Sequence, residues 1–141
     1  MATYNAAEYL SVLAPASNTS DRIIPFSGAP TATITNGDVI NLCKYPAGYK
    51  PVAIFFKTSA AIAGTGGTIT IGTNDGTTNS ANSLVTSQTA TSAITSYHQT
   101  AATPTRAVAD CTVYATLGGS ASFGAAGTTV SGYLIVTPFL V

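Results

Sequence analysis

Short apolar runs separated by turn residues are the feature of this sequence that most constrains its fold. From residue 21 onward, clusters of Gly, Pro, Asn and Asp interrupt the apolar runs at intervals of roughly 8 to 15 residues. An amphipathic helix would need apolar residues three to four positions apart, and no such spacing competes with this pattern. The sequence therefore predicts an all-β chain.

The apolar runs and their alternation predict about eight short strands. Asn36-Gly37 is a strong hairpin signal, and Pro46-Ala47-Gly48 has the residues of a second turn. Residues 73–105 are mostly polar and predict only two short strands in long loops. The expected strands are residues 22–27, 31–35, 38–44, 51–59, 68–72, 84–85, 94–97, 107–117 and 129–140.

This number of strands, without a helix of any length, predicts an antiparallel β-sandwich of jelly-roll type. An immunoglobulin-like sandwich is the alternative, but the chain has no Trp, which the core of that fold usually contains. Residues 21–141 are expected to form a single β-sandwich domain. Residues 1–20 are interpreted as an extended N-terminal arm, although residues 6–13 could also form one or two helical turns.

The arm contains aromatic and aliphatic side chains that need a surface to cover them. That surface is either the chain's own sandwich or a neighbouring subunit, so these residues are the predicted subunit contacts. They are Tyr4, Tyr9, Leu10, Val12 and Leu13.

Charged residues make up only 7% of the chain, against roughly 25% in typical soluble domains. Thr, Ser, Ala and Gly take their place, and burying these residues costs little desolvation or side-chain entropy. Such an exterior favours faces that pack against other subunits, although hydroxyl groups could also simply keep the chain soluble. With five basic and five acidic residues, the sequence has no electrostatic pattern for nucleic acid or an anionic membrane.

The sequence has no signal for secretion or membrane insertion. Its first residues lack the basic and apolar parts of a secretory signal, and no segment approaches the roughly 20 apolar residues of a membrane span. Synthesis in a cytoplasm is therefore expected. Cys43 and Cys111 are accordingly predicted to be buried free thiols, and a bridge between them would require neighbouring strands.

The residues that could carry catalysis are few and scattered. His98 is the only histidine and follows Tyr97 in a polar segment, where it is interpreted as exposed or hydrogen-bonded. The acidic residues stand singly near turn residues, and only Asp38 with Asp110 is retained as a possible carboxylate pair. Asn74-Asp75-Gly76 lacks the further acidic ligands of a calcium loop, and residues 64–68 are interpreted as a β-turn. We expect no enzyme activity, cofactor or metal.

The order of several short motifs resembles small virion proteins of tailed bacteriophages. A Gly-Asp-Val-Ile run at residues 37–40 precedes Pro-Ala-Gly at 46–48 and an apolar strand that ends in Phe-Lys-Thr at 56–58. Further matching pieces are residues 66–72, 81–85, 112–116 and 128–136. The resemblance covers roughly residues 36 to 137.

This resemblance implies a capsid decoration or cement protein. It would be made in the host cytoplasm and bind as a homotrimer to the exterior of the capsid. There it would join subunits of the major capsid protein and reinforce the shell. The polar segment at 73–105 and the low charge depart from the pattern of those proteins, which leaves its station on the virion open. The alternative is a carbohydrate- or host-surface-binding module of a phage fibre or spike, with Asn79, Asn82, Tyr97 and His98 as candidate loop residues.

Overall fold

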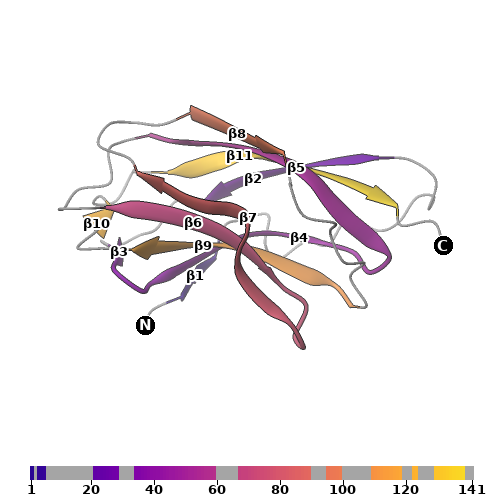
Figure 1. Ribbon diagram of the computed structural model, residues 1–141, viewed down its shortest axis with the longest axis horizontal. Coiled ribbons are helices and arrows are strands. Elements are labelled where there is room, and N and C mark those ends of the chain that lie inside the picture. The colour runs from indigo at the N-terminus through magenta and orange to yellow at the C-terminus, as the bar shows by residue number, and fades with distance from the viewer. Residues whose placement is uncertain are drawn as a thin grey trace.

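A computed structural model describes residues 1, 3–5, 21–28, 34–59, 67–89, 95–99, 109–118, 122–123 and 129–138. Within these ranges every regular element is a β-strand (Figure 1). The strands are β1 (Thr3–Asn5), β2 (Arg22–Gly28), β3 (Ile34–Thr35), β4 (Val39–Tyr45), β5 (Tyr49–Thr58), β6 (Thr68–Asn74), β7 (Asn79–Thr89), β8 (Thr95–Gln99), β9 (Cys111–Gly118), β10 (Ser122–Phe123) and β11 (Val130–Pro138).

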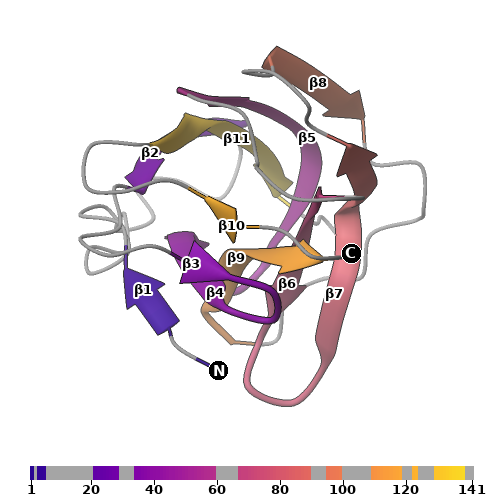
Figure 2. The same ribbon diagram turned by 90° about the vertical axis from the view of Figure 1, so that its left-hand side faces the viewer.

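Two sheets face each other as the layers of a sandwich (Figure 2). The five-stranded sheet has the order β1-β4-β9-β6-β7, and the four-stranded sheet has the order β2-β11-β5-β8. The short strands β3 and β10 form a separate antiparallel pair. All pairings in the two main sheets are antiparallel except that of β1 with β4.

The strand pairs are nested in the sequence and alternate between the sheets. The innermost pair, β6 with β7, lies in the five-stranded sheet, and the next pair, β5 with β8, lies in the four-stranded sheet. The pairs β4 with β9 and β2 with β11 continue this alternation outward. This is the connectivity of one long hairpin rolled into a sandwich, so the predicted jelly roll is confirmed rather than the immunoglobulin-like alternative.

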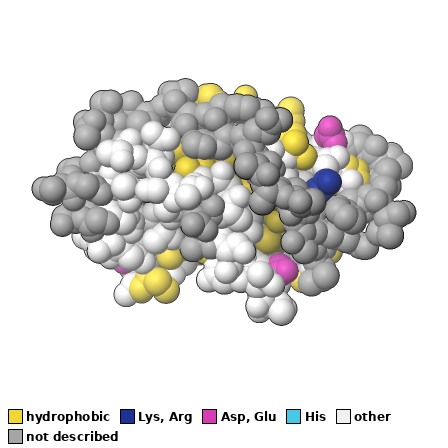
Figure 3. Space-filling model, in the orientation of Figure 1, with side chains coloured by type: hydrophobic (Ala, Val, Ile, Leu, Met, Phe, Trp, Pro, Cys, Tyr) yellow, Lys and Arg dark blue, Asp and Glu magenta, His cyan; other side chains and the backbone are white. Residues whose placement is uncertain are grey.

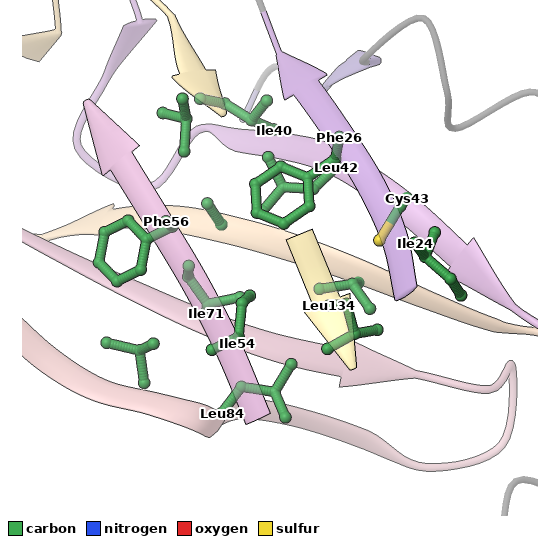
Figure 4. Close-up of a cluster of buried hydrophobic side chains, with 14 of the residues drawn as sticks. Ile24, Phe26, Ile40, Leu42, Cys43, Ile54, Phe56, Ile71, Leu84 and Leu134 are labelled. Carbon is green, nitrogen blue, oxygen red and sulfur yellow. The ribbon is translucent and has the colours of Figure 1, made fainter. Parts of the chain in front are cut away.

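The core fills the space between the two sheets because side chains alternate across each strand. Ile54, Phe56 and Leu134 enter it from the four-stranded sheet, and Leu42 and Ile71 enter it from the five-stranded sheet (Figure 4). All five side chains are fully buried. Among the described residues, no buried side-chain nitrogen or oxygen lacks a hydrogen-bond partner.

The four-stranded sheet accepts Pro25 and Pro51 at positions where a missing N–H donor costs little. The pairing of β11 with β5 shifts register so that Ile135 lies opposite Ala53 and the next residue lies opposite Pro51. Pro51 has no N–H group to donate, and a bulge is one of the few places in a sheet that accept a proline. Pro25 lies in β2 at the edge of its sheet, where the missing donor also costs little.

The polar segment after residue 73 forms a longer strand than the sequence predicts. β7 has 11 residues, most of them Ser, Thr or Asn, and of its side chains whose burial is described, Leu84 and Val85 are the buried hydrophobic ones. As the edge strand of its sheet, β7 needs few apolar contacts, and its backbone pairs with β6. His98 was expected in a loop, but this prediction is wrong, because the residue lies within β8 opposite Ile54.

Cys43 and Cys111 are buried, and neither forms a disulfide, as predicted. Their strands are neighbours, but Cys43 lies opposite Val113, and Cys111 lies opposite Tyr45. The two cysteines are therefore diagonal rather than directly opposite, and diagonal positions are generally too far apart for a disulfide.

Candidate interaction surfaces

The structure separates the two carboxylates that were retained as a possible catalytic pair. Asp38 precedes β4, and its Oδ2 accepts hydrogen bonds from the backbone N–H of Thr35 at 3.0 Å and from the Thr35 hydroxyl at 3.3 Å. Asp110 precedes β9, and its Oδ1 accepts the backbone N–H of Ala47 at 3.3 Å. The carboxylates lie at opposite ends of a ladder that spans roughly 20 Å, too far apart for a glycosidase pair.

The calcium-like segment is a tight turn between β6 and β7. Asp75 Oδ1 accepts the backbone N–H groups of Thr77 at 2.9 Å and Thr78 at 2.6 Å, which lower the pKa of its carboxyl group. Asn74 Oδ1 accepts the N–H of Gly76, whose φ of 86° places it in the left-handed region. Over the described residues, no group of three or more His, Cys, Asp or Glu could hold a metal ion. The described part also contains no helix with the length and apolarity to cross a membrane.

The predicted arm contacts fall mostly outside the described residues. Tyr9, Leu10, Val12 and Leu13 are outside them, and of Tyr4 only the backbone is described. Tyr4 belongs to β1, which adds a short parallel strand to the edge of β4. The start of the chain thus pairs with its own sandwich, and the role of the other arm residues stays a prediction.

An apolar patch lies on the outer face of the four-stranded sheet. We call it the Tyr133 patch and define it as Ile23, Pro25, Phe55, Tyr133 and Ile135. Tyr133 lies opposite both Pro25 and Phe55, and Ile135 lies opposite Ile23. The rings of Phe55 and Tyr133 stack with centroids 5.1 Å apart, and Ile23 is 64% exposed.

The Tyr133 patch presents apolar side chains that are already held in place. Strand pairing and the Phe55–Tyr133 stack restrict their motion, so a partner would meet little loss of side-chain entropy. Covering an exposed Ile side chain contributes about 1–2 kcal/mol. Few Lys, Arg, Asp or Glu side chains appear on the side of the described surface seen in Figure 3. An ordered apolar patch such as the Tyr133 patch suits contact with another protein.

A polar hollow of about 270 Å³ lies on the five-stranded sheet. We call it the Tyr114 hollow, and its lining residues are Met1, Thr3, Val39, Asn41, Asn74, Asn79, Thr112 and Tyr114. The Tyr114 hydroxyl donates a hydrogen bond to Asn79 Oδ1. Burial raises the pKa of Tyr114, and the bond to Asn79 opposes that shift, so the hydroxyl is protonated at neutral pH.

The sequence indicates these two surfaces only in part. The expected alternation in residues 111–117 is confirmed, with Val113 buried and Thr112 partly exposed. That pattern places Tyr114 on the outer side of the sheet but does not reveal its partner Asn79, which lies two strands away in the same sheet. The structure also separates Asn79 in β7 from Tyr97 and His98, which lie in β8 of the other sheet.

Comparisons with known proteins show which fold this is. Searches of protein-family models and of curated proteins each found no match. The structure is similar to a chain of the capsid of Ralstonia phage GP4, with a TM-score of 0.79 and 17% sequence identity over 99% of this chain and 100% of that chain. It is also similar to a chain of the cyanophage Pam1 capsid asymmetric unit, with a TM-score of 0.56 and 20% identity over 91% and 94% of the two chains. The shared feature is the fold.

Proposed function

We propose that this chain is a structural, non-enzymatic protein of a tailed-phage capsid, of the decoration or cement type. It binds the exterior of the shell as a homotrimer and contacts the major capsid protein. The observation that carries the proposal is the similarity of fold, over nearly the whole of both chains, to a chain of a phage capsid.

The composition and the exposed surface support this proposal. A charge-poor exterior is cheap to desolvate, and the Tyr133 patch offers an ordered apolar area for a neighbouring protein. A shell repeats each contact many times, and a trimer that engages three sites gains effective concentration beyond any single contact. Modest interfaces of this kind then hold a shell together.

The experiment is co-sedimentation of the purified chain with shells assembled from the major capsid protein of the same phage. Saturable binding at a fixed ratio is expected, together with a native mass in light scattering of three times that of one chain. Ile23→Ser and Tyr133→Ser together should weaken binding at least tenfold, since each loses about 1–2 kcal/mol of apolar burial. Ser87→Ala, an exposed change in β7 of the other sheet, is the control.

The arm contributes to the same binding in this proposal. Removing residues 1–16 would also delete β1, so a sharper variant keeps β1 and replaces Tyr9, Leu10 and Leu13 by Ser. This triple variant should keep the thermal stability of the wild type and lose shell affinity. Wild-type affinity of the triple variant would remove the arm from the proposal.

The alternative function is a carbohydrate-binding module of a fibre or spike. Of the four candidate loop residues for that function, Asn79 is the one that lines a pocket in the described part of the chain. Asn79 lines the Tyr114 hollow, whereas Tyr97 and His98 belong to the other sheet. Failure to bind shells, combined with binding to intact host cells, would favour this alternative over the capsid role.

A further inference from the structure

We propose that the Tyr114 hollow is a binding site for a neutral sugar, with a pyranose ring as the unit recognised. This site lies on the five-stranded sheet, whereas the Tyr133 patch lies on the four-stranded sheet, and it would give a virion protein a second activity, attachment to a polysaccharide or glycan. The inference rests on how the polar side chains of the hollow are oriented and on which charges the hollow lacks.

Two amide groups in the hollow are oriented by bonds within the protein. Asn74 and Asn79 lie directly opposite each other on β6 and β7. Asn74 Oδ1 accepts the backbone N–H of Gly76 at 2.8 Å, and Asn79 Oδ1 accepts the hydroxyl of Tyr114. Each oxygen has a protein partner, and the Nδ2 group of each amide is a donor that a ligand in the hollow can use.

Hydroxyl groups complete the set on the neighbouring strand. Tyr114 uses its hydroxyl proton toward Asn79, so its oxygen keeps the capacity to accept a bond. Thr112 lies opposite Asn74 in β9, and its hydroxyl both donates and accepts. Two amide donors beside acceptors on an adjacent strand match neighbouring hydroxyls of a sugar, each of which also donates and accepts.

The charge and the volume of the Tyr114 hollow further restrict the ligands that it can bind. Among the described residues that line the hollow, none has a charged side chain. The volume of about 270 Å³ is slightly below the range of roughly 300–1,000 Å³ that is usual for ligand sites, which suits one ring better than an extended molecule. The backbone of a partner strand would seek a sheet edge, but this hollow is lined from all five strands of its sheet.

The test is titration of the full chain with free sugars, followed by amide and side-chain NMR. The probes are glucose, galactose, mannose and N-acetylglucosamine, with N-acetylneuraminate as the acidic comparison. At least one neutral sugar should shift the side-chain amide signals of Asn74 and Asn79 saturably, with a dissociation constant on the order of millimolar. Oligosaccharides with that sugar should bind more tightly if the natural source is a polysaccharide, and equally if it is the free sugar.

Variants separate a binding role from a structural one. Asn79→Asp keeps an acceptor for the Tyr114 hydroxyl but removes the Nδ2 donor, so it should fold normally and bind the sugar at least tenfold more weakly. Asn74→Ala should weaken binding similarly, and Thr86→Ala, an exposed change farther along β7, should leave it unchanged.

Absence of saturable shifts with every neutral sugar, or binding of the acidic sugar alone, would overturn the proposal. Sugar binding that Asn79→Asp leaves intact would also overturn it. Shell binding by Asn79→Asp should equal that of the wild type, so failure of the sugar site and failure of the capsid role are told apart.

Discussion

Replacing Gly132 by Ala should destabilise this protein more than the same change at Gly118. Gly132 lies in β11 opposite Phe26 and Phe56. An added Cβ would overlap the carbonyl oxygen of Phe55 and lie 2.8 Å from the Cα of Phe56. The obstacle is the main chain of the adjacent strand β5, so no side-chain rotation can relieve it.

The expected loss of stability follows from the need to displace the main chain of β5. Overpacking a core typically costs about 1–3 kcal/mol, and a backbone obstacle places Gly132→Ala at the upper end, at about 3 kcal/mol. For a chain of this length that loss corresponds to a melting temperature lower by roughly 10 °C. Urea unfolding followed by circular dichroism, at a single protein concentration, measures the free energy of unfolding directly.

Gly118→Ala in β9 is the matched control. There the added Cβ would lie 2.6 Å from Thr68 Oγ1, the end of a side chain that can rotate away. Its cost should therefore stay below about 1 kcal/mol. Equal costs for the two variants, or a Gly132→Ala protein as stable as the wild type, would refute the assigned pairing of β11 with β5.

Three further outcomes are expected from the same structure. Burial raises the pKa of Cys111, and Cys43 is fully buried. A thiol reagent should therefore label both cysteines only at the rate at which the protein unfolds. Fast labelling in native buffer would contradict their burial. Asp38→Ala removes two hydrogen bonds to Thr35 and should cost about 1–2 kcal/mol in urea unfolding, whereas Asp38→Asn keeps an acceptor and should cost less; the reverse order would count against this turn. Backbone N–H donors lower the pKa of Asp75 in the folded state below its value in the unfolded state. The stabilising contribution of Asp75 is therefore present above the unfolded pKa and is lost as the pH falls through the folded pKa. An NMR titration of Asp75 with a midpoint at or above the unfolded value would contradict these bonds.

The sequence predicts the sandwich well because local signals agree with the final pairing. Asn36-Gly37 leads into β4 with Gly37 at a φ of 85°, and Gly48 lies at a φ of 84° in the turn that precedes β5. Ile69 and Ile71 are buried at alternate positions of β6, as their spacing predicts. Turn chemistry and a period of two are local properties, so one sequence is enough to find them.

Long-range features could not be predicted in the same way. The length of β7 depends on its backbone pairing with β6, and its Ser and Thr residues carry little apolar signal for that pairing. The Tyr133 patch joins residues of β2, β5 and β11, and the Tyr114 hollow joins all five strands of the other sheet. Which residues meet across strands depends on register, and the bulges at Val52 and Leu42 change that register.

The most direct test of the capsid role is an electron cryomicroscopy map of shells that lack this chain, compared with shells saturated with the purified chain. Added density is expected on the outer surface, at fixed positions and in groups of three, with the jelly roll fitted so that the Tyr133 patch contacts the shell. Shells without added density at saturating concentrations would contradict it.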